Sequence, residues 1–270
     1  MNDDAFQNAI RALCGNEAPR VWSFIVTIFG DLTQAQGDAI SGPVLADILL
    51  PVGVRPEAMR VALHRLRNEG WLETSKRGRE ALHSLTPSGF EQSARASHRI
   101  YAEDHRAGPD WHVLCYPPAL SSEEQVRAEA FAHQGYVAIS SGVYLSNGEL
   151  SPNAKDAFVI KGTIGDVPQW LSKALVPDAL TLGFNDLSSA LELATLTSLT
   201  SEDLSAIQIA TLRALIVHRW RKLILKTPNF PDRLFGPQFE GTRCRAKVVQ
   251  ALSALPKPMI SNLTRVGSSL

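Results

Sequence analysis

The first hundred residues show apolar positions with helical spacing, broken by one short extended segment. Residues 19–29 (PRVWSFIVTIF) are mostly apolar and predict a buried helix that ends at Gly30. Residues 38–40 predict a short strand, and Ser41 predicts the cap of a second helix over residues 42–50. The chain is therefore expected to begin with a helical region that contains one short strand.

The third predicted helix, over residues 54–69, has two different faces. Its apolar side chains recur at i, i+3, i+4 and i+7 and are Met59, Ala62, Leu63 and Leu66. A second face is polar and carries Glu57, Arg60, His64 and Arg67. Gly70 predicts the end of the helix. We expect the apolar face to pack inward and the polar face to remain available to a partner.

A basic hairpin is predicted directly after this helix. Residues 71–76 and 80–85 indicate two short strands around a glycine turn, whose tip Lys76-Arg77-Gly78-Arg79 holds three cations in four residues. Thr86 and Pro87 then predict the start of a helix that continues to about residue 102. The resulting order is two helices, a basic helix, a basic-tipped hairpin and another helix.

This order is typical of a winged helix-turn-helix domain. Residues 51–79 hold seven basic and three acidic side chains, a local net charge of +4. An α-helix fits the major groove of DNA, where arginine hydrogen-bonds to guanine, and a cationic tip reaches phosphates or the minor groove. A winged helix that contacts a protein is the alternative, and Arg65, beside the apolar stripe, is a candidate for an internal ion pair. The residues predicted to bind DNA are Arg55, Arg60, His64, Arg67, Lys76, Arg77 and Arg79.

The middle of the chain alternates between strand and helix patterns. Apart from a further strand over residues 157–162, the order strand, helix, strand, strand, helix, strand indicates a ferredoxin-like domain. Its last strand, over residues 179–183, has the weakest pattern. The predicted strands are 111–116, 136–140, 142–145, 157–162 and 179–183, and the predicted helices are 121–133 and 167–175.

The C-terminal part predicts helices only, one from about residue 201 to 223 and one over residues 243–255. The expected fold class is thus α+β multidomain. It comprises an N-terminal winged helix-turn-helix (1–106), a central ferredoxin-like domain (107–185) and a C-terminal α-helical domain (186–270).

Charge divides the chain in the same way. Lys and Arg number 27 and so do Asp and Glu, but residues 107–204 hold 4 basic and 12 acidic groups, a net of −8. Residues 205–250 hold 9 basic and 2 acidic groups, a net of +7. Three widely spaced cysteines fit a reducing cytoplasm rather than a disulfide framework, and no signal peptide or membrane span is expected. We find no catalytic constellation, metal site or cofactor motif in the sequence.

Five short motifs occur along the chain. They are Phe29-Gly30-Asp31; Arg60, Ala62, Leu63, Arg65, Leu66, Gly70, Trp71 and Leu72; Leu85-Thr86-Pro87-Ser88-Gly89; Leu215, His218, Trp220 and Arg221; and Thr227-Pro228-Asn229-Phe230-Pro231-Asp232-Arg233-Leu234. With these motifs the chain resembles the PaaX family, bacterial transcriptional repressors of phenylacetate catabolism and their relatives. In the last motif, Thr227 and Phe230 depart from the Asp and Leu that are commoner in the family.

The resemblance implies a homodimeric repressor that binds a double-stranded operator and is released by an aryl-acyl-CoA such as phenylacetyl-CoA. It also implies that the central ferredoxin-like domain is Cas2-like, that is, similar to Cas2 proteins. Arginine and lysine suit the phosphates of coenzyme A through charge-assisted hydrogen bonds. The candidate effector-binding residues are His218, Arg219, Arg221 and Lys222. Two simpler explanations stay open: the basic C-terminal part neutralises the acidic middle part, and His218 is a buried, satisfied histidine.

The sequence therefore predicts a cytoplasmic, non-enzymatic repressor of an aromatic-acid catabolic operon, without a membrane partner. An enzyme that processes CoA thioesters or cleaves nucleic acid is the first alternative, but it requires an acid–base or metal set that we cannot locate. A winged-helix interaction module without DNA affinity is the second alternative.

Overall fold

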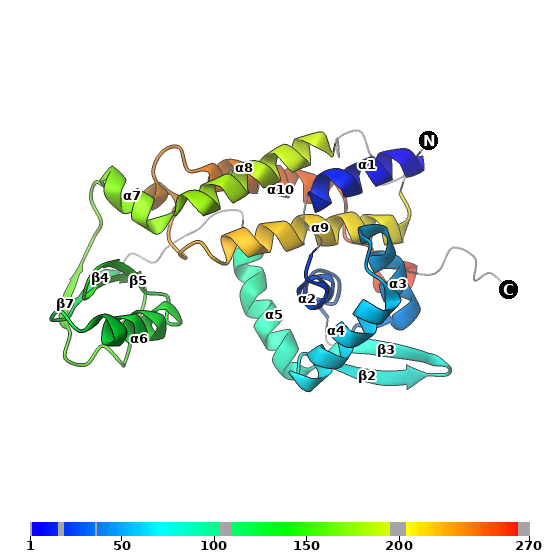
Figure 1. The fold of residues 1–270 in the computed structure, drawn as a ribbon, viewed down its shortest axis with the longest axis horizontal. Helices are drawn as coiled ribbons and strands as arrows, with labels where there is room; N and C mark the ends of the chain where they lie inside the picture. The colour runs from blue at the N-terminus through cyan, green and yellow to red at the C-terminus, as the bar shows by residue number, and fades with distance from the viewer. Residues whose placement is uncertain (1, 16–18, 36, 103–109, 195–203, 264–270) are drawn as a thin grey trace. The chain divides into compact units, whose positions relative to one another are not determined.

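The computed structural model describes residues 2–15, 19–35, 37–102, 110–194 and 204–263. It confirms a mixed α/β fold with two antiparallel sheets (Figure 1). The helices are α1 (Asn2–Cys14), α2 (Val21–Leu32), α3 (Gly42–Leu49), η1 (Leu50–Val52), α4 (Pro56–Asn68), α5 (Pro87–Ile100), α6 (Ser121–Ala132), α7 (Gln169–Leu175), α8 (Asp178–Leu193), α9 (Ala206–Ile224), η3 (Asp232–Phe235), α10 (Glu240–Ala254) and η4 (Ile260–Asn262). The strands are β1 (Ala39–Ser41), β2 (Leu72–Arg77), β3 (Glu80–Leu85), β4 (Trp111–Cys115), β5 (Val137–Ser140), β6 (Val143–Asn147) and β7 (Phe158–Gly162).

The chain forms two compact units. The first unit combines residues 1–102 with 185–222 and 243–270, and the second combines 103–184 with 223–242. The C-terminal helices α9 and α10 therefore belong largely to the same unit as the N-terminal region.

Helix α9 is the central element of the first unit, and Figure 1 shows it in yellow. Residues 211–218 of this helix are all buried, which explains why its sequence is apolar on more than one face. The Trp220 indole donates to the carbonyl of Ile100 at the end of α5, at 2.8 Å. Arg219 donates to the carbonyl of Leu13 in α1, at 3.0 Å. Two helices of the N-terminal region, α1 and α5, are thus tied to a buried helix from the C-terminal part of the chain.

The N-terminal region contains α2, α3, α4 and a three-stranded sheet of order β1-β3-β2. Ser41 caps α3 by accepting a hydrogen bond from the amide of Val44, as its position predicts. The predicted end of the first helix at Gly30 is wrong, because α2 continues to Leu32. A Cβ at Gly30 would lie 2.9 Å from the hydroxyl of Ser93, so the glycine permits the close approach of α5.

The second unit contains an antiparallel sheet of order β5-β6-β4-β7. Its core joins the sheet to α6 and consists of Leu114, Phe131, Tyr136 and Tyr144. The predicted strand over residues 179–183 is wrong, because this segment begins α8. The helical spacing of Leu180, Phe184, Leu187 and Leu191 outweighs the local strand pattern, and the last three of these side chains are buried.

Candidate nucleic-acid interface

The helix α4 owes its bounds to local sequence. Arg55 is extended at the N-cap and Pro56 occupies the first turn, where a missing N–H costs nothing. At the other end Gly70 has a φ of 72°. The amide of Gly70 donates to the carbonyl of Arg67 at 3.0 Å, and the amide of Trp71 donates to the carbonyl of Leu66 at 2.9 Å. These two bonds form a Schellman motif, which fixes where the chain leaves the helix.

The apolar stripe of α4 packs inward as predicted, because Ala62, Leu63 and Leu66 are buried and Met59 is partly buried. Arg60, His64 and Arg67 are exposed and follow each other at i, i+4 and i+7, so they form one stripe on the solvent side. Arg60 lies 3.8 Å from Glu57, with both side chains at least 70% exposed. Such an exposed pair is worth at most about 1 kcal/mol, so it leaves Arg60 able to turn toward a ligand.

Arg65 has an internal role, as its place beside the stripe predicts. Its Nε donates to Oε1 of Glu69 at 2.7 Å, and its guanidinium lies 4.5 Å from the ring centroid of Trp22 on α2. A cation over an aromatic face contributes roughly 0.5–1 kcal/mol at an exposed site. Arg65 therefore fastens α4 to α2.

The hairpin β2–β3 projects three cations on a short turn. Arg77 pairs with Glu80, so Gly78 and Arg79 form a two-residue loop. Gly78 has a φ of 62°, which a type II′ turn requires at its first central residue. Lys76, Arg77 and Arg79 are all exposed. The turn that the glycine permits is thus what presents the basic tip.

The junction between α4, the hairpin and α5 is tightly packed. The Thr86 hydroxyl donates to the carbonyl of Gly70, and the same oxygen accepts from the amide of Gly89 at 3.0 Å. The Thr86 amide donates to the carbonyl of Trp71 at 3.0 Å. A Cβ at Gly89 would lie 2.3 Å from that carbonyl oxygen. Helix and hairpin therefore share one rigid support.

All seven residues predicted to bind DNA are exposed on this support: Arg55, Arg60, His64, Arg67, Lys76, Arg77 and Arg79. Sequence reasoning missed two further exposed side chains of α4. Val61 is 71% exposed and is suited to contact with a thymine methyl group, and Asn68 is suited to an adenine edge. In the sequence, Val61 could have been noted as an apolar residue on the side of the helix away from the packing stripe.

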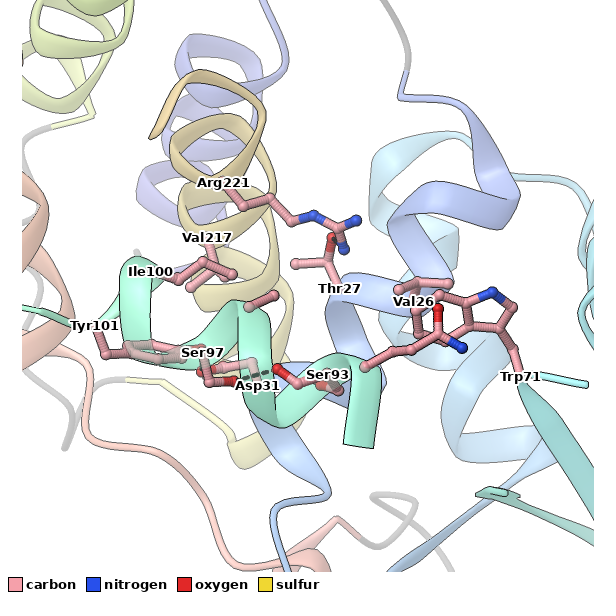
Figure 2. Close-up of a pocket in the computed structure, with 13 residues that line it drawn as sticks. Val26, Thr27, Asp31, Trp71, Ser93, Ser97, Ile100, Tyr101, Val217 and Arg221 are labelled. Atoms are coloured by element: carbon pink, nitrogen blue, oxygen red, sulfur yellow. Dashed lines mark hydrogen bonds between the residues drawn. The ribbon is translucent and has the colours of Figure 1, made fainter. Parts of the chain in front are cut away.

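The candidate effector residues fall into two places. His218, Arg219 and Lys222 line a cavity of about 620 Å³ between α1, α8 and α9. Arg221 instead lines a cavity of about 40 Å³ between α2, α5 and α9 (Figure 2). Sequence spacing alone could not separate them, because His218, Arg221 and Lys222 stand at i, i+3 and i+4 and are therefore neighbours on one face of the helix.

Buried polar contacts connect these two places. His218 is 4% exposed, its ring packs edge-on against Phe24, and its Nδ1 lies 2.9 Å from the hydroxyl oxygen of Thr27. The same oxygen accepts from Nη1 of Arg221 at 3.1 Å. Burial, with smaller contributions from Arg221 and Lys222, lowers the pKa of His218 to about 3. The histidine is therefore neutral at physiological pH.

A second buried group lies at the edge of the small cavity. Figure 2 shows Asp31 on α2 and Tyr101 after α5. The Tyr101 hydroxyl donates to Oδ1 of Asp31 at 2.6 Å, and both oxygens of Asp31 accept from the guanidinium of Arg213 at 2.8 and 2.9 Å. Burial and the adjacent carboxylate raise the pKa of Tyr101. The phenol thus stays a donor at neutral pH.

Within the residues that the structure describes, no group of three His, Cys, Asp or Glu side chains is placed to hold a metal ion. In the same part of the chain, no helix combines the length and apolar character needed to cross a membrane.

Comparison with known proteins places similarity at both ends of the chain. A family model described as "PaaX-like protein" matches residues 20–89, and one described as "PaaX-like protein C-terminal domain" matches residues 177–259. Together they match more than half of the chain. The "Transcriptional repressor PaaX" of Escherichia coli is 25% identical over 244 residues, which are 83% of this chain and 76% of that protein.

Among solved structures, an uncharacterized protein of Mycobacterium tuberculosis (Rv0674) superposes with a TM-score of 0.53. It is 17% identical, and the match covers 86% of this chain and 93% of the other. This likeness concerns the fold only.

Proposed function

Because the chain belongs to the PaaX-like family, we propose that it is a DNA-binding transcriptional repressor. The observation that carries the proposal is the set of exposed cations on α4 and on the β2–β3 tip, two elements that one packed junction holds together. The similarity to a transcriptional repressor of E. coli supports it.

In this proposal residues 21–100 act as a winged helix-turn-helix. Helix α4 enters the major groove, where Arg60, His64 and Arg67 meet base edges or nearby phosphates. Arg55 and the three cations of the hairpin tip contact the backbone or the minor groove. Base contacts set the preferred sequence, whereas phosphate contacts set the dependence on salt.

The test is an anisotropy titration on the DNA upstream of the protein's own gene, at two salt concentrations. We expect Arg60→Ala to weaken binding by about 1–3 kcal/mol, a factor of about 5 to 150. Arg77→Ala combined with Arg79→Ala should lower the salt slope by about one unit for each phosphate that is no longer neutralised. Lys247→Ala, on α10, is the control and should bind as the wild type does. Equal binding by all variants would refute the assignment of this surface.

We also propose that the repressor forms a homodimer through the second unit. Its sheet has the strand order and directions of a ferredoxin-like domain, with a loop in place of the helix between β6 and β7. The strand β7 lies at the sheet edge and carries Phe158, 70% exposed, and Ile160, 49% exposed. Antiparallel pairing of two copies of β7 about Val159 sets each Phe158 opposite the Ile160 of the partner.

Analytical ultracentrifugation tests this pairing. Ile160→Lys should shift the protein toward the monomer, because it places a charge in a self-complementary apolar contact. Leu182→Lys, which replaces a 68% exposed leucine of α8, should leave the mass unchanged. A dimer that tolerates Ile160→Lys would exclude β7 from the interface.

The proposed inducer is an aryl-acyl-CoA of the phenylacetyl type, and the proposed target is an aromatic-acid catabolic operon. The cations near residues 219–222 support a ligand that carries phosphates. Isothermal titration with phenylacetyl-CoA and with free CoA tests the inducer. We expect heat with the thioester, and no heat with either compound would remove this ligand class.

A further inference from the structure

The cavity between α1, α8 and α9 has the size and lining of a small-molecule site. Its volume of about 620 Å³ lies within the range of roughly 300–1,000 Å³ that ligand pockets occupy. Leu13, Ala190 and Leu215 line it and are buried, which gives it an apolar wall. Such a wall favours a ligand with an apolar part.

The charged side chains of the lining are mostly cationic. Arg11, Arg219 and Lys222 line the cavity, and Asp186 is the acid that lies among them. Asp186 is engaged by an ion pair with Nη2 of Arg219. Arg219 also donates to the carbonyl of Leu13, so its position is fixed. Lys222 is exposed and able to reach a ligand. The lining thus favours a negatively charged group.

A series of side-chain contacts connects this cavity to α4 through α2. His218 lines the cavity, and its Nδ1 is engaged by Thr27, so Nε2 is the ring nitrogen left for a ligand. Thr27 belongs to α2, which packs against α4 and contacts it again through Trp22 and Arg65. A ligand that changes the hydrogen bond of His218 therefore acts on the helix that supports α4.

We propose that this cavity binds an organic anion with an apolar part, and that α2 senses its occupancy through the His218–Thr27 contact. The anionic group contacts Lys222 and Arg219, and the apolar part lies against the buried leucine and alanine side chains. The proposal has a binding half, in which the ligand occupies the cavity, and a sensing half, in which α2 responds to it. The binding half does not depend on DNA, whereas the sensing half rests on the proposed repressor function. A ligand shifts DNA binding only by its difference in affinity between the two states of the protein.

Alkylation of a cysteine in the cavity can measure the binding half of the proposal. Cys14 lines the cavity, whereas Cys115 belongs to the other unit, and both side chains are partly exposed. Alkylation by iodoacetamide, followed by peptide mass spectrometry, gives the rate at each thiol separately. The probes are phenylacetyl-CoA, free CoA, phenylacetate and inorganic pyrophosphate.

We expect a probe with both anionic and apolar parts to slow alkylation of Cys14 about tenfold at ten times its Kd, with Cys115 unchanged. Lys222→Glu should raise that Kd by a factor of about 10 or more, because it replaces a charge-assisted contact by a repulsion. Lys226→Glu, an exposed lysine outside the cavity lining, is the matched control. No protection of Cys14 by any probe overturns the site, and equal protection in both lysine variants overturns the role of the anion.

Thr27→Val tests the sensing half, with Thr27→Ser as the control that keeps the hydroxyl. In the Thr27→Val variant, the ligand should still protect Cys14 from alkylation. The ligand should no longer change the affinity of this variant for DNA. A ligand effect on DNA that survives Thr27→Val overturns the coupling. Failure of the repressor function itself looks different, because DNA then does not bind even without ligand while Cys14 protection remains.

Discussion

The substitution Asp31→Asn tests how the two ends of the chain are held together. Asp31 is 1% exposed and accepts from Arg213 and from the Tyr101 hydroxyl. Arg213 reaches further, because its Nη1 donates to the carbonyls of Leu252 and Leu255 at 3.2 and 2.5 Å. One carboxylate thus joins α2, the end of α5 and α9, and its partner joins α10.

The expected loss of stability follows from burial. The side chains of Asp31 and Arg213 are 1% and 8% exposed, so the asparagine variant leaves a guanidinium buried without its counter-charge. Removing one partner of a buried pair costs about 3–5 kcal/mol. The exposed pair Glu91–Arg95, at 68% and 72% exposure, is worth at most about 1 kcal/mol. Asp31→Asn should therefore cost several times more than Glu91→Gln.

Hydrogen exchange measures this destabilisation within the first unit, which is necessary because two units need not unfold together. We expect Asp31→Asn to speed exchange in peptides of α2 and α9 by a factor of about 100 or more, in proportion to the decrease in free energy of unfolding. Glu91→Gln should change it less than about fivefold. The double variant Asp31→Asn with Arg213→Met should recover part of the stability, since no charge is then left buried. Equal effects of Asp31→Asn and Glu91→Gln would refute the reasoning.

Three further predictions concern single side chains. Because burial lowers the pKa of His218 to about 3, the unfolded chain takes up a proton that the folded chain does not. His218 should therefore lower the free energy of unfolding by about 1.4 kcal/mol per pH unit as pH falls from 6.5 toward 3, and in urea titrations the slope of His218→Gln should be smaller than that of the wild type by this amount. Gly89→Ala should cost about 1–3 kcal/mol in urea denaturation, because its Cβ meets the carbonyl of Trp71, whereas Gly165→Ala, which meets nothing within 4 Å, should be nearly neutral. Arg65→Ala should cost about 1 kcal/mol of stability and leave the salt slope of DNA binding unchanged, and a lower slope would show that Arg65 contacts phosphate.

The sequence was most informative where structure is decided within a few residues. The apolar stripe of α4, the cap at Ser41 and the end at Gly70 all appear in the structure as predicted. Each rests on hydrogen bonds or packing between neighbours along the chain. The exposure of the seven candidate DNA-binding residues follows from the same local pattern, although their contact with DNA stays a prediction.

The sequence was misleading where interactions between distant residues decide. Gly30 looked like a helix end, but its smallness accommodates Ser93 of α5. Residues 179–183 looked like a strand because the helical repeat that includes them continues beyond that window. The pairing of Asp31 with Arg213, 182 positions apart, has no local signal at all. The cavity between α1, α8 and α9 has no local sequence signal either, because its walls come from three separate helices.

The motif residues themselves explain why the family match is good evidence for the fold and weaker evidence for the operator. Gly30 and Asp31 hold α5 and α9 against α2, Thr86 and Gly89 join the hairpin to α5, and Trp220 bonds the end of α5. These residues make contacts within the protein, so they are constrained by packing whatever sequence is bound. Of the seven candidate DNA-binding residues, only Arg60 lies within a motif. Operator preference should therefore reside in exposed positions that the family pattern leaves free, and exchanging Val61, His64, Arg67 and Asn68 for those of a relative should change the preferred sequence without changing the fold.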